Sequence, residues 1–335
     1  MKTSITFLFV FVISLIIISC DDGDIIVTTF DFDQETPLSL CQQDGNNVLY
    51  FIDSETNEAI SLEFDLDEFD GSFEGLADPD PIVLNIDNTN RVIYRKLSGQ
   101  PEGGASAYYC QQVPPSSPQV LEEFISTTGG TVTIQISILA QDDDDDVPAE
   151  IEDRNNNGDF FDDDSDGDGI PDFLDIDDDN DNVLTKSEEL EREDDNGNII
   201  PGEYTDTDND GNRNYLDNND DGDAVLTINE DLNYCDDPQN PALNPTNDIN
   251  VDGLPHYLNN QETGSVNITI LQSNVITRSF LTTIVFTDIT FESVNSNESL
   301  TFQNFPMGRY EATVEQRIQF LDGSVSDDDT TIDCP

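Results

Sequence analysis

The feature that most constrains this chain is a long acidic segment, residues 141–262, in which many carboxylates are separated by a single residue. The stretch DSDGDGIPDFLDIDDDNDNVLTKSEE, which begins at Asp164, is typical of it. Residues 142–260 contain 40 of the 73 acidic residues in the 335-residue chain. Two unit charges about 6 Å apart repel each other by roughly 3 kcal/mol at an effective dielectric constant near 20. The segment is therefore either a solvated, disordered tract or a structure that holds divalent cations.

The segment carries a repeat, and random acidic tracts do not hold a fixed register. The motifs DSDGDGIPDFLD, DTDNDGNRNYLD and DINVDGLPHYLN begin at Asp164, Asp206 and Asp248, each 42 residues after the last. Two further motifs begin at Asp177 and Asn219, again 42 residues apart and each 13 residues after the preceding motif. This periodicity indicates repeated structural units, and we expect them to be ordered when cations are bound.

The spacing within each motif is typical of calcium ligation. Oxygen ligands at positions 1, 3 and 5, a turn at position 6 and a carboxylate at position 12 describe a calcium loop of the EF-hand type. We name each 12-residue loop by its first residue. The expected ligands are Asp164, Asp166, Asp168, Asp172 and Asp175 in the 164 loop; Asp177, Asp179, Asp181 and Glu188 in the 177 loop; Asp206, Asp208, Asp210, Asn214 and Asp217 in the 206 loop; and Asn219, Asp221, Asp223 and Glu230 in the 219 loop.

Position 6 differs between the loops. It is Gly in the 164 and 206 loops, Asn182 in the 177 loop and Ala224 in the 219 loop. Asn tolerates a left-handed turn and Ala does so poorly, so we expect poorer geometry in the 219 loop.

Three further loops are weaker matches to the calcium pattern. The candidate ligands are Asp143, Asp145 and Glu152 in the 141 loop; Asp153, Asn155 and Asn157 in the 153 loop; and Asp248, Asn250 and Asp252 in the 248 loop. The 153 loop would end on Asp164 and share that carboxylate with the next ion. His256 at position 9 of the 248 loop is expected to be a turn or packing residue, because calcium prefers oxygen ligands.

The stretches DSDGDGIPDFLDIDDDND and DTDNDGNRNYLDNNDDGD resemble thrombospondin type 3 repeats. The resemblance covers residues 141–262 and implies loops wrapped around rows of calcium ions, with little apolar core. Helical EF-hands are the alternative, but prolines such as Pro171 and Pro255 and the lack of long amphipathic runs argue against paired helices. Folding and calcium binding would then be one event, and the segment would be disordered without calcium.

The flanks of the acidic segment read as β structure. Residues 25–140 contain short runs rich in β-branched and aromatic residues, separated by turn signals, and predict an N-terminal β-sandwich. Residues 263–335 have the same character. They form either a separate small β domain, which we favour from sequence, or the strands that complete the N-terminal sandwich. The predicted fold class is therefore mainly β, with an acidic repeat segment that has little regular secondary structure.

The N-terminus predicts export and lipidation. Residues 1–19 have one Lys followed by an apolar run that is short for a membrane span, as in a secretory signal peptide. Ser19-Cys20 resembles a bacterial lipobox, which implies lipidation of Cys20. Residues 20–24 continue with acidic residues, as in surface lipoproteins of the flavobacterial type, which the chain resembles in overall layout. We therefore expect a lipid-anchored protein of the outer membrane, exposed at the cell surface.

The remaining cysteines are candidates for disulfides. Cys41, Cys110, Cys235 and Cys334 are an even number in an exported chain, with three possible connectivities. We favour Cys41–Cys110, because both lie in the N-terminal β region, and therefore Cys235–Cys334.

Charge and motifs limit the function classes. A formal net charge of −62 excludes nucleic acid as a partner, because phosphate binding requires basic residues. We expect a calcium-binding structural, adhesion or partner-presenting protein that is not an enzyme. A glycan- or protein-capturing accessory lipoprotein is the alternative. A hydrolase is a third hypothesis, since Asp53 and Glu63 in the β region could form an acid–base pair. Carboxylates at such positions are more often solvated residues at strand edges than catalytic groups.

Overall fold

The computed structural model describes residues 30–113, 115–188, 204–236, 242–321, 323–327, 332 and 334. The predicted signal peptide, Cys20 and the acidic residues that follow it lie outside these residues. The structure is mainly β, as the sequence predicts. Within the described ranges, no helix has the length and apolar character that crossing a membrane requires.

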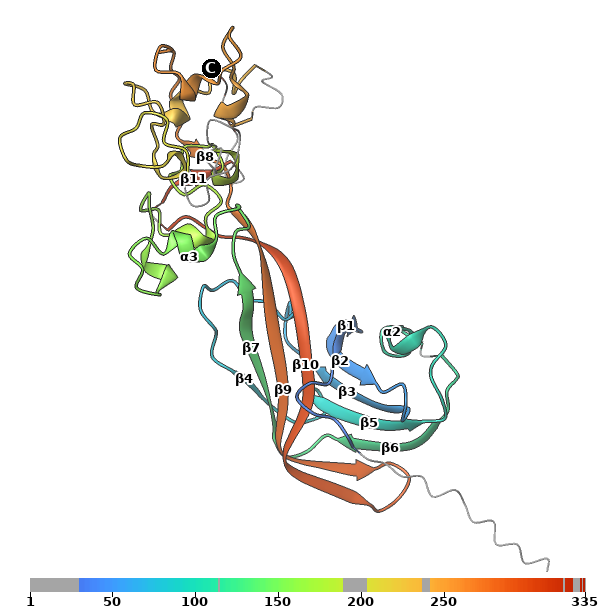
Figure 1. Cartoon of the computed structure of the whole chain (residues 1–335). Coiled ribbons are helices and arrows are strands. Elements are labelled where there is room, and N and C mark those ends of the chain that lie inside the picture. Colours follow the sequence, from blue (N-terminus) through green and yellow to red (C-terminus); the bar gives the residue numbers. More distant parts are fainter. Residues whose placement is uncertain are drawn as a thin grey trace, which may run out of the picture.

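Both flanks of the acidic segment contribute strands to one sheet (Figure 1). The N-terminal flank supplies β1 (Ser39–Gln43), β2 (Asn46–Ile52), β3 (Glu58–Phe64), β4 (Ile82–Asn85), β5 (Arg91–Leu97), β6 (Val120–Ser126) and β7 (Thr131–Gln141), with helix α2 (Gly104–Tyr109) between β5 and β6. The C-terminal flank adds an antiparallel hairpin of two 19-residue strands, β9 (Val275–Ser293) and β10 (Ser299–Arg317). The strand order is β1-β2-β3-β5-β6-β9-β7-β4, with β10 on the other edge of β9.

Strand β9 joins two halves of this sheet because it pairs with two strands along one edge. Residues 278–287 pair with β7, whereas Glu292 and Ser293 pair with β6. Between these stretches Asp288 has a positive φ of 53°, and the register of β10 shifts between Pro306 and Gly308. The long hairpin bends sharply here (Figure 1), so the two halves of the sheet face each other as in a sandwich.

The apolar core lies between the two halves. Phe280, Ile284 and Phe286 of β9 are fully buried and pack with residues of β2, β3, β5, β6 and β7 in one cluster. The preference for a separate C-terminal domain is therefore wrong, and the alternative is correct: the C-terminal strands complete the N-terminal sandwich. A two-stranded hairpin cannot cover its own apolar face, so β9 and β10 require the layer from the N-terminal flank.

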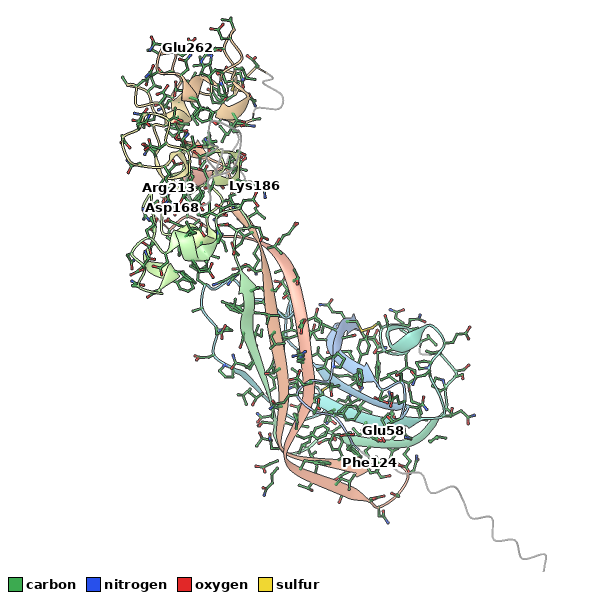
Figure 2. All side chains as sticks on the ribbon, viewed as in Figure 1. Glu58, Phe124, Asp168, Lys186, Arg213 and Glu262 are labelled. Carbon is green, nitrogen blue, oxygen red and sulfur yellow. A yellow bond between two sulfur atoms is a disulfide. The ribbon has the colours of Figure 1, made fainter. Side chains whose placement is uncertain are left out.

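The acidic segment is inserted between β7 and β9, at the end of the hairpin away from most of the sandwich (Figure 1). Its described parts contain helix α3 (Ala149–Glu152) and one-turn 3-10 helices at Phe160–Asp162, Asp172–Leu174, Thr185–Ser187, Asn214–Leu216, Thr227–Asn229, Pro245–Asn247 and His256–Leu258. Asp168, Lys186 and Arg213 lie near the hairpin, and Glu262 lies at the far end (Figure 2). The predicted alternative of paired EF-hand helices does not fit these parts.

The chain after β10 returns along the acidic segment. Ile318 at the end of the hairpin packs with Ile170, Phe173 and Leu174 of the 164 loop. Farther on, β11 (Val325–Ser326) pairs in parallel with β8 (Ile270–Leu271), the strand that precedes the hairpin. These contacts fix the base of the acidic segment to the hairpin.

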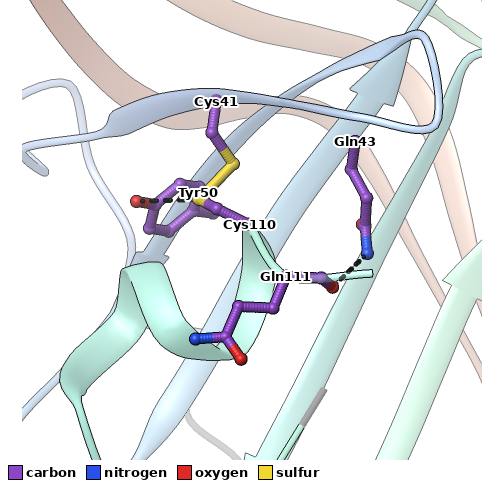
Figure 3. Close-up of a disulfide and its surroundings, with 5 residues drawn as sticks. All are labelled: Cys41, Gln43, Tyr50, Cys110 and Gln111. Carbon is purple, nitrogen blue, oxygen red and sulfur yellow. Dashed lines mark hydrogen bonds between the residues drawn. A yellow bond between two sulfur atoms is a disulfide. The ribbon is translucent and has the colours of Figure 1, made fainter. Parts of the chain in front are cut away.

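Two disulfides are present, with the connectivity favoured from sequence. Cys41–Cys110 ties β1 to the end of α2 beside Tyr50 (Figure 3). Cys235–Cys334 ties the acidic segment to the C-terminal end of the chain. The second disulfide therefore holds the chain that follows β10 against the acidic segment.

Candidate metal centres

The 153, 164, 177 and 206 loops share one backbone framework, in which the first carboxylate accepts hydrogen bonds from the following turn. In the 177 loop, Asp177 accepts them from the N–H groups of Asp181 (3.2 Å) and Asn182 (3.0 Å). In the 164 loop, Asp164 accepts a bond from the N–H of Gly169 (3.1 Å). Aspartate side chains stabilise turns in this way. The backbone thereby curls around the carboxylates of each loop.

The side chain at position 9 closes the loop. Thr185 accepts a hydrogen bond from the N–H of Asp178 at position 2 (3.1 Å), and Asp172 accepts one from Ser165 (2.7 Å). Asn214 does the same in the 206 loop (2.9 Å). Asp172 and Asn214, which the sequence predicts as ligands, therefore hold the loop closed and do not join an acidic cluster. A one-turn 3-10 helix begins at position 9 in each of these loops and leads to the residue at position 12.

The 219 loop lacks one of the two left-handed residues of the 164, 177 and 206 loops. In the 177 loop, Asn180 at position 4 and Asn182 at position 6 have positive φ of 55° and 70°. In the 219 loop, Gly222 at position 4 has a positive φ of 65°, but Ala224 at position 6 does not. The acidic residues of the 219 loop still converge.

Five groups of acidic side chains converge within the described residues. In each group, one potential ligand atom from every member lies within 4.8 Å of those from the other members. The groups are Asp143, Asp145 and Glu152; Asp164, Asp166 and Asp168; Asp179, Asp181, Glu188 and Asp220; Asp206, Asp208 and Asp210; and Asp221, Asp223 and Glu230. Four of the groups lie in a single predicted loop each, and the group that contains Asp220 joins the 177 and 219 loops. The 141 loop, a weaker match to the motif, forms one as well.

The group of Asp179, Asp181, Glu188 and Asp220 has four members and is the most buried of the five. We call it the 177 cluster. Asp179, Asp181, Glu188 and Asp220 are each at most 6% exposed. Both carboxylate oxygens of Asp179, Glu188 and Asp220 lack a hydrogen-bond partner in the described part of the chain. An ionised carboxylate that is buried without a partner costs several kcal/mol. A cation bound among these oxygens would remove that cost.

Burial and mutual repulsion raise the pKa of these carboxyl groups. Burial, followed by repulsion from Asp179, raises the pKa of Asp220 to about 10. Burial and then repulsion from Asp145 raise the pKa of Glu152 to about 9. Burial and then repulsion from Asp221 raise the pKa of Glu230 to about 8. These carboxyl groups are therefore poorly able to ionise at neutral pH in the absence of a cation.

Other predicted ligands lie beside the groups. Asp175 is buried and accepts a hydrogen bond from the N–H of Asp177 (3.2 Å). Asp217 accepts one from the N–H of Asn219 (3.1 Å). The side-chain oxygen of Asn219 is buried without a partner, so it is available as a further oxygen ligand for the 219 loop.

The 153 and 248 loops do not gather three acidic side chains. Asn155 and Asn157 donate their side-chain amides to Asp162 (3.0 and 2.7 Å), although Asp153 closes its turn as in the other loops. In the 248 loop, Asp248 accepts a hydrogen bond from the N–H of Leu232 (2.5 Å). The side chains of Asn250 and Asp252 belong to no acidic group.

Sequence reasoning missed Asp220 and Asp178, which stand at position 2 of their loops. Position 2 is not a ligand position in an EF-hand loop. Both residues are 2% exposed, and both oxygens of each carboxylate lack a partner among the described residues. Their separation of 42 residues, equal to the repeat, was the available signal.

The carboxylates of the sandwich have structural roles. Asp53 accepts hydrogen bonds from the N–H groups of Glu55 (2.9 Å) and Thr56 (2.6 Å) in a turn. Glu63 forms an ion pair with Arg91 (2.6 Å).

Comparison with known proteins gives one match. A family model described as BamM C-terminal matches residues 142–205, which include the 153, 164 and 177 loops and most of the 141 loop. The match covers less than half of the chain and does not assign the chain to that family. No curated protein and no solved structure shows significant similarity to the chain. The matched family is not described as a thrombospondin repeat, so that resemblance remains a prediction from sequence.

Proposed function

We propose that the acidic segment is an array that folds around several calcium ions, in a lipid-anchored protein of the outer-membrane surface. The observation that carries the proposal is the 177 cluster, in which four carboxylates are buried and three of them lack a hydrogen-bond partner among the residues that the structure describes. Four further groups repeat the arrangement with three members each. Bound cations would convert the repulsion within these groups into attraction.

The donor atoms favour calcium over other metals. The groups offer carboxylate oxygens, whereas zinc and copper sites usually include His or Cys. Calcium takes six to eight oxygen ligands at about 2.3–2.6 Å in flexible geometry, but magnesium demands a near-octahedral arrangement and retains water. Loops with carboxylates at alternate positions and at position 12 suit the larger ion. Extracellular sites of this type work at about 0.1–1 mM calcium.

The fold suggests what the array does. The long β9–β10 hairpin carries the sandwich at one end and the acidic segment at the other (Figure 1). Phe30, ten residues after the predicted anchor at Cys20, packs against Tyr94 in the sandwich core with ring centroids 3.9 Å apart. Ten residues span at most about 35 Å, so the anchor would keep the sandwich near the membrane. A calcium-stiffened array would then present a fixed surface to a partner, in an adhesion or assembly role that requires no catalysis.

Calcium titration of the soluble chain that begins at Asp21 tests this proposal. We expect the acidic segment to be expanded and protease-sensitive when the protein has been stripped of divalent cations. Millimolar calcium should compact it, as small-angle scattering would record, and protect residues 141–262 from protease. Magnesium at the same concentration is the control and should do neither fully. A chain that stays expanded in calcium would contradict the proposal.

A hollow beside the first disulfide favours a second candidate function, the capture of a polar ligand such as a glycan. It is lined by Gln43, Glu63, Arg95, Tyr108, Tyr109, Val120 and Glu123. Tyrosine rings can stack on sugars, and the Arg95–Glu123 pair offers hydrogen bonds to hydroxyl groups. Binding to immobilised glycans that is lost in Tyr108→Ala and retained in Tyr310→Ala would support this candidate. Equal loss in both variants would argue against it.

A further inference from the structure

We infer that the cation held by the 177 cluster joins two successive 42-residue repeats, so that the array folds as one cooperative unit and not loop by loop. The inference rests on the proposed calcium binding and deepens it, because it assigns Asp220 as a ligand that links repeats. Three members of the cluster, Asp179, Asp181 and Glu188, come from the 177 loop. The fourth, Asp220, comes from the 219 loop in the next repeat.

The geometry of Asp220 supports this role. Its side chain is 2% exposed, and neither carboxylate oxygen has a hydrogen-bond partner in the described residues. One of these oxygens lies within 4.8 Å of ligand atoms from all three acidic residues of the 177 loop. The other four acidic groups in the described ranges are each made by a single loop. The 177 cluster therefore differs from them in spanning two repeats.

The 219 loop divides its carboxylates between two centres. Asp221 and Asp223 converge with Glu230 of their own loop, whereas Asp220 converges on the preceding repeat. The N–H of Asp220 donates to the hydroxyl oxygen of Thr227 (3.3 Å), which fixes the backbone at position 2. The same loop thus contributes to one centre within its repeat and to one between repeats.

The arrangement has a counterpart one repeat earlier. Asp178, 42 residues before Asp220, is equally buried and equally without partners for its oxygens in the described chain. Burial is the largest cause that raises the pKa of Asp178, and repulsion from Asp172, Glu152 and Asp145 raises it further. Asp145 and Glu152 belong to the group in the 141 loop, so Asp178 lies near that group. Lys186 also reaches that loop and forms an ion pair with Asp146 (3.1 Å). Asp178 and Asp220 therefore both lie near an acidic group of an earlier loop.

The test compares three variants of the soluble chain from Asp21 in calcium titrations. Asp220→Asn removes the ligand that links the repeats. Asp210→Asn removes one carboxylate from a group made by the 206 loop alone, and Asp236→Asn changes an exposed residue of the same segment by the same charge. Bound calcium is counted, and compaction of the array is followed by small-angle scattering. Retained near-ultraviolet signal from the sandwich aromatics shows that each variant is folded.

We expect Asp220→Asn to raise the calcium midpoint for compaction about tenfold or more and to lower the Hill coefficient, because the repeats then fill separately. Asp210→Asn should weaken about one ion while the Hill coefficient for the remaining ions is kept, and Asp236→Asn should match the wild type. Asp220→Glu, which keeps a carboxylate, should restore part of the cooperativity. If Asp220→Asn behaves like Asp210→Asn, the link between repeats is refuted although calcium binding stands. If the wild type binds no calcium, both proposals fail.

Discussion

The side-chain amide of Asn274 donates a hydrogen bond to the backbone carbonyl of Leu174, 2.7 Å away, although the residues lie 100 positions apart in the chain. Asn274 immediately precedes β9, and Leu174 lies in the 3-10 turn of the 164 loop. The backbone carbonyl of Asn274 also accepts a bond from Ile318 (3.0 Å), just after β10. One buried residue therefore connects both strands of the hairpin to the base of the acidic segment.

Asn274→Ala should weaken this junction. The substitution leaves the carbonyl of Leu174 without its donor in a buried place, which costs about 1–3 kcal/mol. We expect this loss in the calcium-loaded protein, measured as earlier protease cleavage and a lower unfolding midpoint of the acidic segment. Asn295→Ala, in the exposed turn of the hairpin, is the matched control and should change stability by less than about 0.5 kcal/mol. Equal effects of the two substitutions would contradict the role of the junction.

Two glycines of the 164 loop provide a matched pair. Gly167 and Gly169 both have positive φ, 81° and 97°. An added Cβ would meet open space at Gly167, but at Gly169 it would lie 2.6 Å from the Cβ of Leu321. Leu321 belongs to the chain that returns after β10, and its N–H donates to the backbone carbonyl of Asp168 (2.8 Å).

Gly167→Ala should therefore cost only the backbone strain, about 1 kcal/mol. Gly169→Ala should cost the same strain and also displace Leu321, so its effect on the calcium midpoint should be clearly larger. Calcium titration of both variants under identical conditions is the measurement. If Gly167→Ala proves as damaging as Gly169→Ala, the contact with the returning chain contributes nothing to the loop.

The acidic segment should also respond to pH when no divalent cation is present. In the folded segment the pKa values of Asp220, Glu152 and Glu230 are raised to about 10, 9 and 8, from unfolded values near 4. The folded state therefore binds more protons than the unfolded state between pH 4 and these values. Its stability is fully present below about pH 4 and falls progressively as the pH rises from there to the folded values.

Protein stripped of divalent cations should accordingly be compact near pH 4.5 and expanded near pH 7.5 in small-angle scattering. Calcium at pH 7.5 should restore the compact form, because it replaces the protons among the carboxylates. Asp220→Asn, which removes one of the titrating groups, should reduce the pH dependence. Identical expansion of the stripped protein at both pH values would show that repulsion among these carboxylates does not control folding.

Arg278 at the start of β9 is buried and makes its contacts with neutral groups. Its guanidinium donates to the side chains of Gln316 (2.9 Å) and Gln141 (2.8 Å) and to the carbonyl of Gly75 (2.8 Å). It also lies 5.0 Å from the centre of the Phe280 ring. Desolvation lowers its pKa.

Arg278→Leu would leave the side chains of Gln141 and Gln316 and the carbonyl of Gly75 without this donor, and should destabilise the sandwich by about 1–3 kcal/mol in urea unfolding. Arg91→Leu is the control, because Arg91 is 42% exposed and its ion pair with Glu63 contributes less than about 1 kcal/mol. A result in which Arg91→Leu is the more destabilising of the two would contradict the anchoring role of Arg278.

The sequence predicts the acidic loops well because their chemistry is local. Carboxylates spaced two residues apart accept hydrogen bonds from backbone groups within the same turn, so the residues at positions 3 and 5 converge wherever the motif is complete. The pattern did not predict that Asp172 and Asn214 at position 9 accept hydrogen bonds from the N–H of position 2, because an EF-hand pattern assigns only a ligand there. Asp220 was missed because its partners lie in the preceding repeat.

The topology of the β strands was harder to predict, since it depends on contacts between residues far apart in the sequence. Residues 275–293 contain an apolar alternation that predicts strand, but the pattern does not say which strands cover it. Pairing of β9 with β6 and β7 requires the bend at Asp288, a residue that ordinarily signals a turn or a loop. The insertion of the acidic segment within one sandwich was therefore one of two alternatives that the sequence left open.

Calcium binding by the acidic groups can be measured with an ion count on the soluble chain from Asp21, by equilibrium dialysis with calcium followed by elemental analysis. We expect saturable binding of about five ions, one for each acidic group, with compaction complete as the ions bind. Non-saturable binding without compaction would contradict this expectation, because the buried carboxylates of the 177 cluster would then have no cation to hold them together.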